Sequence, residues 1–143
     1  MTIPNLNLVA TIPLLFLSGW ASLLLLIDLW IPKSRKTITA WLALLGLLIT
    51  LFMVLRQLGL REEAFGGMLA IDGFSSVMHV VFLTSGGISV LMASSYLRQH
   101  SIERGEFYPL LLFSVIGMMT MAMARDLIVV FLALELLSIP LYV

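Results

Sequence analysis

A carboxylate stands in the middle of the apolar stretch FLALELLSIPLYV, which runs from Phe131 to Val143. Glu135 is the ninth residue counted from Leu127, where this apolar run begins. At about 1.5 Å per residue, a helix would place it ~12 Å inside the run, near the middle of a membrane's ~30 Å hydrocarbon core. Desolvation in such a place favours the neutral form of an acid, whereas a nearby cation favours the ionised form. Small changes around the acid can therefore make it take up or release a proton. Intramembrane acids commonly mark ion pathways, and we interpret Glu135 as a proton carrier.

Pro140 follows the acid and predicts a break in its helix. Proline has no N–H to donate to the carbonyl of Leu136, and its ring crowds the preceding turn. The freed carbonyl and the hydroxyl of Ser138, on the same helix face as Glu135, can then hold water beside the acid. The alternative is that Glu135 only makes an interhelical hydrogen bond and Pro140 is a packing kink. We favour the proton-carrying interpretation, with Ser138 and Pro140 as local helpers.

His79 is the other candidate titrating residue, and it lies in an apolar run rich in small residues. Ser85, Ser89 and Ala93 recur there at a spacing of four residues, which is typical of a face that lets another helix approach closely. We therefore favour a hydrogen-bonded packing residue over a titrating His79. His100 is distant in sequence, and no carboxylate lies at ligand-like spacing between the two histidines, so a metal site within this chain is not expected.

Three further charged residues lie at the ends of apolar runs. Asp28 is followed by a basic connection that includes Lys33 and Arg35, and we expect it to pair with that connection at the membrane interface. Asp126 is expected to cap the helix that begins at Leu127, and Arg125 to anchor it at the interface.

Composition identifies the elements that must position these residues as membrane helices. The chain has 143 residues, of which 61% are hydrophobic and 11% charged, and its mean hydropathy is +1.11. Eight Lys and Arg balance eight Asp and Glu, so no basic face for nucleic acid is expected. Cysteine is absent, which excludes thiolate-held iron–sulfur clusters within this chain. No removable signal peptide and no nucleotide-binding loop are recognisable.

Short polar clusters divide the sequence into five apolar lengths, each close to what a membrane-crossing helix requires. The leucine-rich runs lack the alternation of barrel strands, so the predicted fold is an all-α polytopic bundle. The expected spans are 8–31, 37–58, 74–97, 107–124 and 127–143, the last of them too short to be a complete crossing.

Basic residues gather in the first and third connections between these spans. Alternate connections lie on the same side of a membrane, and the side richer in Lys and Arg is normally cytoplasmic. Five of the eight Lys and Arg fall in these two connections, namely Lys33, Arg35, Lys36, Arg98 and Arg104. We therefore expect the N-terminus to be external, or periplasmic.

The stretch EFYPLLLFSVIGMMTMAMARDLIVVFLALELLSIPLYV closely resembles the subunit N family of bacterial proton-translocating NADH-quinone oxidoreductases, the respiratory complex I. ELLSIPLY is its most specific part, and IDGFSS upstream agrees with it. The resemblance implies an antiporter-like subunit of the membrane arm. Glu135 matches the family's buried glutamate on the fifth transmembrane helix, which is thought to pair with a lysine on a later helix. Family members have more helices than this chain has room for, so we expect an N-terminal fragment that lacks this lysine.

The resemblance further implies a place in the bacterial inner, or plasma, membrane. Its partners would be the other membrane-arm subunits and the lipid bilayer, and the chain itself would perform no redox chemistry. No cofactor is expected in it, because FMN and the iron–sulfur clusters would belong to partner subunits. Two alternatives stay open: an Mrp-type cation/proton antiporter subunit, and a structural helix-bundle subunit without a proton path.

Overall fold

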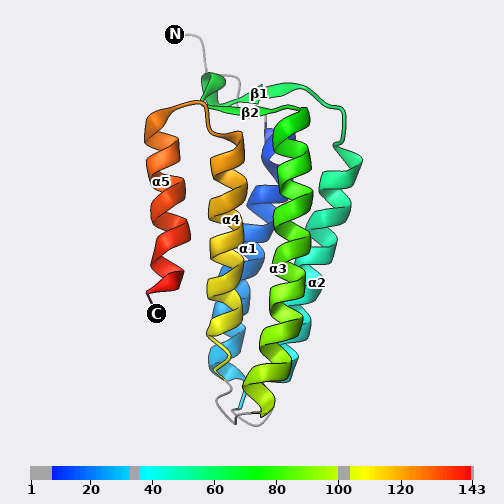
Figure 1. The fold of residues 1–143 in the computed structure, drawn as a ribbon, viewed down its shortest axis with the longest axis vertical. Coiled ribbons are helices and arrows are strands. Elements are labelled where there is room, and N and C mark those ends of the chain that lie inside the picture. The colour runs from blue at the N-terminus through cyan, green and yellow to red at the C-terminus, as the bar shows by residue number, and fades with distance from the viewer. Residues whose placement is uncertain (1–7, 33–35, 100–103, 143) are drawn as a thin grey trace.

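A computed structural model of the chain describes residues 8–32, 36–99 and 104–142 and consists mainly of helices (Figure 1). The prediction of an all-α bundle is confirmed. The helices of the described residues are α1 (Leu8–Trp30), α2 (Thr37–Arg56), α3 (Gly73–Gln99), α4 (Phe107–Met123) and α5 (Leu127–Ser138), with short 3-10 turns at Phe65–Gly67 (η2) and Ile139–Leu141 (η3).

The helices stand side by side and alternate in direction, so the connections gather at two ends of the bundle (Figure 1). The last residues of α1 and α3 and the first residues of α2 and α4 lie at one end, which we call the Lys36 end. The strands and the connection from α4 to α5 lie at the other end, which we call the hairpin end. Helices α1 to α4 pack around a common core, and α5 packs against α4. The core contains Leu17, Leu24, Leu47, Leu83, Leu112 and Met119.

Three of the described helices are long and apolar enough to cross a membrane: Thr11–Trp30, Thr37–Arg56 and Gly73–Leu97. Helix α4 and the apolar segment Leu127–Leu141 are shorter. Large apolar side chains also cover the outside of the bundle, and Leu29, Trp30 and Leu127 are each more than 80% exposed. An apolar exterior is what lipid requires, and the chain is a multi-pass membrane protein.

Small and hydroxyl-bearing side chains let the helices approach one another, as is typical of membrane bundles. Ala21, Ala43, Thr39 and Thr50 are all buried between helices. Gly117 of α4 marks the tightest approach of α5, because a Cβ there would lie 2.8 Å from the amide nitrogen of Leu137 and 2.9 Å from the carbonyl oxygen of Ala133. Ser85 and Ser89, expected to line a packing face, are exposed in the described part of the chain.

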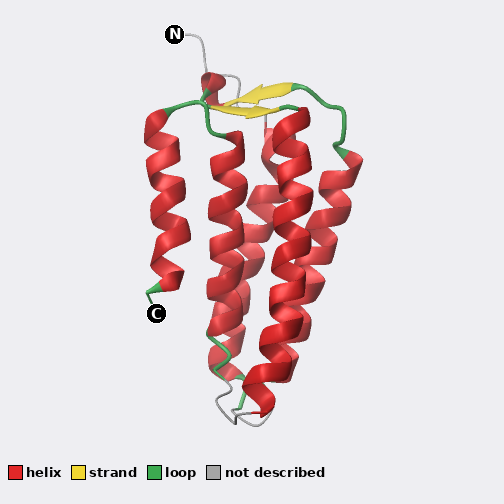
Figure 2. Cartoon of the chain, viewed as in Figure 1, coloured by secondary structure: helices red, strands yellow, loops and turns green. Residues whose placement is uncertain are grey.

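A two-stranded hairpin between α2 and α3 covers one end of the bundle, and we did not predict it (Figure 2). Strand β1 (Glu62–Ala64) pairs antiparallel with β2 (Leu69–Ile71). The turn that joins them has positive φ at Phe65, Gly66 and Gly67, a conformation that glycine adopts without steric cost. The buried residues of the hairpin pack on Met123 near the end of α4.

Helix α3 begins at a reciprocal cap formed by Asp72 and Ser75. The Ser75 N–H donates to the Asp72 carboxylate over 2.8 Å, and the Asp72 N–H donates to the Ser75 hydroxyl over 2.9 Å. The bond from the Ser75 backbone N–H is the main reason that the pKa of Asp72 lies below its usual range. The ionised form of Asp72 therefore stabilises this helix start.

Candidate functional site

Helix α5 carries Glu135, and both of its ends follow from the sequence. The predicted cap is confirmed at its start, where the Asp126 carboxylate accepts the Ile128 N–H over 2.8 Å. The α-helix ends at Ser138 and continues as the η3 turn, which contains Pro140. Because proline donates no N–H, the helix changes type within one turn of the acid.

The Glu135 side chain projects from an apolar face of α5 that is exposed in the structure. The residues of this face recur at helical spacing: Ile128, Phe131, Leu132, Glu135 and Ile139. Buried Ala133 marks the opposite face, which packs on α4 at Gly117. Among the described residues, no side chain donates a hydrogen bond to the Glu135 carboxylate. The acid thus faces away from the other four described helices, on a surface that is otherwise suited to lipid or to another apolar helix.

Two hydroxyls flank the end of α5, only one of which we singled out from the sequence. Ser138 Oγ donates to the carbonyl oxygen of Leu134, 2.7 Å away, so this hydroxyl is engaged with its own helix. Ser114 Oγ of α4 lies 3.4 Å from the carbonyl oxygen of Leu137, at the turn where the helix changes type. The available signal for Ser114 was a hydroxyl three residues before Gly117 in a largely apolar helix.

His79 is buried between α3 and α4, and 6% of its surface is exposed. Its Nε2 lies 3.0 Å from the carbonyl oxygen of Met119. Because a carbonyl only accepts, the ring must carry a proton on Nε2 to make this bond. This geometry is that of a hydrogen-bonded packing residue. His79 and Glu135 lie on different helices, and no described hydrogen bond joins them.

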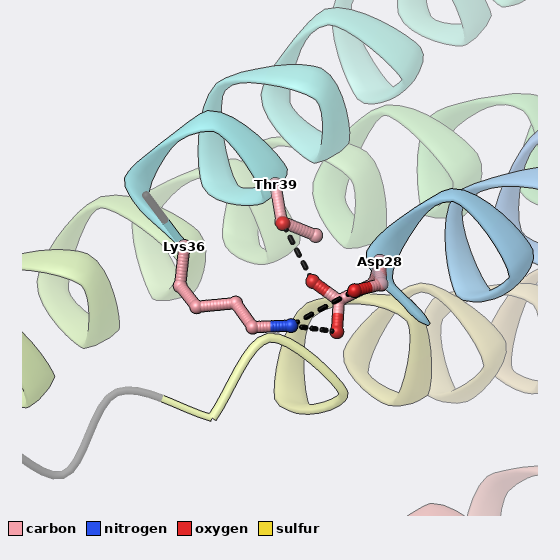
Figure 3. A network of polar contacts seen from close by, with 3 residues as sticks. All are labelled: Asp28, Lys36 and Thr39. Atoms are coloured by element: carbon pink, nitrogen blue, oxygen red, sulfur yellow. Dashed lines mark hydrogen bonds and ion pairs between the residues drawn. The ribbon is translucent and has the colours of Figure 1, made fainter. Parts of the chain in front are cut away.

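Asp28 lies in a buried polar cluster rather than at an exposed interface (Figure 3). Lys33 and Arg35 lie outside the described residues, and the basic connection contributes Lys36 instead. Its Nζ is 2.7 Å from Oδ2 of Asp28 and 2.9 Å from the Asp28 carbonyl oxygen. Thr39 Oγ1 donates to the other carboxylate oxygen over 2.7 Å. The role of Thr39 was not foreseen, because a threonine in an apolar helix commonly bonds only its own backbone.

Arg125 joins the start of α5 to the hairpin. Its guanidinium pairs with Glu63 of β1, and its backbone N–H donates to the carbonyl of Met68 over 2.8 Å. Both side chains of the ion pair are more than half exposed. Arg125 therefore anchors α5 through a partner 62 residues away in sequence, which the pattern of the sequence alone did not reveal.

No group of three His, Cys, Asp or Glu side chains within the described ranges could hold a metal ion. The site is a single acid on an apolar helix face, and the helix passes from α to 3-10 within one turn beyond it. Such an arrangement can exchange a proton with water or with a basic partner.

Comparison with known proteins relates the whole chain to one family of membrane subunits. The chain is 43% identical to "NADH-quinone oxidoreductase subunit N" of Chloroflexus aggregans over 144 residues, covering 100% of this chain and 29% of that protein. It is 40% identical to "NADH-quinone oxidoreductase subunit N 2" of Roseiflexus castenholzii, again over 100% of this chain and 29% of the relative. No protein-family model matches the chain.

The fold agrees with these relatives. A chain of respiratory complex I from Thermus thermophilus, solved with bound aureothin, superposes with a TM-score of 0.74 at 31% sequence identity. The match covers 91% of this chain and 28% of that chain. The chain thus spans about 29% of the length of the curated relatives it matches. By sequence and by fold, it belongs to the subunit N family of NADH-quinone oxidoreductases over the part of those proteins that it spans.

Proposed function

We propose that this chain is part of a membrane-arm subunit that translocates protons, and that Glu135 carries them. Electron transfer from NADH to quinone would take place in partner subunits, which would hold the FMN and the iron–sulfur clusters. The relation to subunit N along the whole chain supports the assignment to this complex. The observation that carries the proton-carrying role is the placement of Glu135, an acid without a described partner on an apolar helix face.

An acid in this position needs a covering group, because an ionised carboxylate facing hydrocarbon costs several kcal/mol. In the family that the chain resembles, the matching glutamate is thought to pair with a lysine on a later helix. We propose that a helix of this kind, outside this chain, covers the exposed face of α5. A nearby ammonium group would favour the carboxylate, and its withdrawal would favour the neutral acid. Redox energy released in partner subunits would move the pair between these two arrangements, so that Glu135 takes up a proton from one side and releases it to the other.

Ser138 and Pro140 are proposed as helpers of this exchange. Supporting this, the α-helix gives way at Ile139 to the 3-10 turn that contains Pro140, and Ser114 brings a hydroxyl to the carbonyl of Leu137 just before that turn. Carbonyl groups without a helical partner are places where water can bind inside a membrane protein. Ser138 would join them only by exchanging its bond to Leu134 for one to water.

For the orientation, we propose that the Lys36 end faces the cytoplasm and the N-terminus the periplasm of the inner membrane. Among the described residues, the Lys36 end holds Lys36, Arg98 and Arg104, and the hairpin end holds Arg56, Arg61 and Arg125. The full count of five basic residues against three supports this assignment through the positive-inside rule. A reporter enzyme fused after Lys36 that is active only in the periplasm would contradict it.

Two experiments test the proposed function against its alternatives. The intact subunit, tagged and purified from its membrane, is expected to bring flavin- and cluster-bearing subunits with it. Purification without any redox partner would instead support a cation/proton antiporter subunit. Glu135→Gln keeps much of the hydrogen-bonding shape of the acid, so it is expected to lower proton pumping while the complex still assembles. Unchanged pumping would support a structural subunit in which Glu135 only joins helices.

A further inference from the structure

A buried ion pair closes the Lys36 end of the bundle, and the proposed proton path does not use it. The Asp28 and Lys36 side chains are 3% and 12% exposed, and Thr39 beside them is 0% exposed. These residues come from the ends of two helices, since Asp28 lies in the last turn of α1, whereas Lys36 is the N-cap of α2 and Thr39 lies in its first turn (Figure 3). The cluster therefore ties the end of one helix to the start of the next.

The bonds of the cluster satisfy both charges. One carboxylate oxygen accepts from the ammonium group and the other from the Thr39 hydroxyl. The ammonium group also donates to the backbone carbonyl of Asp28, near the C-terminus of α1, where the helix dipole favours a cation. A buried ion pair is costly to break from one side only, because the remaining charge is left without a partner.

Gly105, which lies just before α4, packs directly on this carboxylate. A Cβ built on Gly105 would lie 1.9 Å from Oδ1 and 2.4 Å from Oδ2 of Asp28, so only glycine fits there. Gly105 itself is buried, and its carbonyl accepts the N–H of Tyr108 in the first turn of α4. The start of α4 is thereby held against α1 through Asp28.

An open groove of about 670 Å³ lies next to the cluster and is lined by Asp28, Lys36, Arg104, Gly105 and Glu106, among others. Lys36 is the more exposed member of the ion pair, and Thr39 is fully enclosed. The cluster thus extends from the groove, where Lys36 is partly exposed, to the bundle interior, where Thr39 is fully buried.

We propose that Asp28, Lys36 and Thr39 form a latch: their paired charges keep this end of the bundle closed to water from the groove, and a lone charge at Asp28 or Lys36 opens it. Gly105 packs on the Asp28 carboxylate and thereby fixes the start of α4. This proposal depends only on contacts within this chain, and it does not require that Glu135 carries protons.

The test uses a single cysteine as a reporter in the intact subunit in its membrane. The chain has no cysteine of its own, and Ala43, one turn beyond Thr39 on α2, is 0% exposed. If the subunit has a cysteine elsewhere, it is first replaced. Ala43→Cys should react slowly with a membrane-impermeant maleimide while the latch is closed. Asp28→Asn and Lys36→Met, each alone, are expected to raise the labelling rate at least about tenfold, because each leaves a buried group unpaired.

The double variant D28N/K36M separates a latch from a general loss of structure. It removes both charges, so labelling is expected to return to within about twofold of the parent rate. If the single variants fail to accumulate in the membrane whereas the double variant accumulates normally, the proposal is equally supported. A double variant that labels as fast as the faster single variant, or that fails to accumulate, would overturn it.

Two control sets complete the design. Glu63→Gln and Arg125→Met disrupt an exposed ion pair at the opposite end, and they should leave the labelling rate of Ala43→Cys unchanged. Gly105→Ala should raise the labelling rate in the parent, because the new methyl group would collide with the Asp28 side chain. It should do the same in D28N/K36M, because asparagine is as large as aspartate. In D28A/K36M, where the bulk is removed, the same change should be tolerated. Slow labelling of Gly105→Ala in the parent would contradict the close packing of Gly105 on the Asp28 carboxylate.

Discussion

Replacing Gly117 by alanine tests how closely α5, the helix of Glu135, must approach α4. The new methyl group would lie 2.8 Å from the amide nitrogen of Leu137 and 2.9 Å from the carbonyl oxygen of Ala133. Both are backbone atoms, so no side-chain rotation can relieve the contact. Restoring ordinary contact requires α5 to retreat by roughly half an ångström or more.

The energetic cost follows from this geometry. Overpacking a close-packed interface typically costs about 1–3 kcal/mol, and we expect Gly117→Ala in that range because the obstacle is a whole helix. Gly19 of α1 provides a matched control, since a Cβ there meets nothing within 4 Å. Gly19→Ala should be neutral or slightly stabilising, as alanine is the better helix former. Gly86→Ala should fall between the two, because its nearest obstacle is a methyl group of Val115 at 2.8 Å.

The assay is the free energy of unfolding of the intact subunit in mild detergent, measured for the three alanine variants side by side. The expected order of destabilisation is Gly117→Ala, then Gly86→Ala, then Gly19→Ala. If Glu135 carries protons as we propose, pumping should fall with Gly117→Ala as well, because a displaced α5 moves this acid from its working position. A Gly117→Ala protein as stable as Gly19→Ala would refute the close packing of α4 and α5.

Three other predictions concern the ends of the helices and the buried histidine. Asp72→Ala should lower the unfolding free energy by about 1 kcal/mol at neutral pH, since it removes a helix cap. Because the folded-state pKa of Asp72 lies below its ordinary value of 3.8, this difference should persist above that pH and vanish as the folded carboxylate is protonated below it. His79→Gln keeps a side-chain donor for the carbonyl on α4, so pumping should be largely retained in vesicles; a severe loss would indicate a titrating histidine. Arg125→Gln should change the unfolding free energy by less than about 1 kcal/mol, because its pair with Glu63 is exposed, and a larger loss would show that the pair fixes the hairpin.

The helices, the cap at Asp126 and the end of the α-helix just before Pro140 could be predicted because they depend on local chemistry. Runs of apolar residues indicate helices in lipid wherever they occur, and proline acts on the turn that precedes it. The same local reasoning applied to Asp28 correctly indicated a partner in the following basic connection. It did not foresee burial of the pair, because burial depends on Gly105, which is 77 positions further along the chain.

The hairpin and the partner of Arg125 could not be predicted, because both depend on pairing across distance. Three-residue strands carry too little alternation of apolar and polar residues to stand out in the sequence. The packing of α5 on Gly117 and the contact of the Ser114 hydroxyl with α5 likewise depend on which faces of the two helices meet. A membrane helix is apolar on every side, so hydrophobic periodicity does not reveal its contact face.

The most direct test of the central claim is the number of protons pumped per NADH oxidised by sealed membrane vesicles in which the intact subunit carries Glu135→Gln. Assembly of the complex is checked first, and Glu63→Gln serves as a control because that acid is exposed at the hairpin end. The account predicts a lowered ratio for Glu135→Gln and an unchanged ratio for Glu63→Gln. An unchanged ratio for Glu135→Gln, in a fully assembled complex, would contradict a proton-carrying role for this residue.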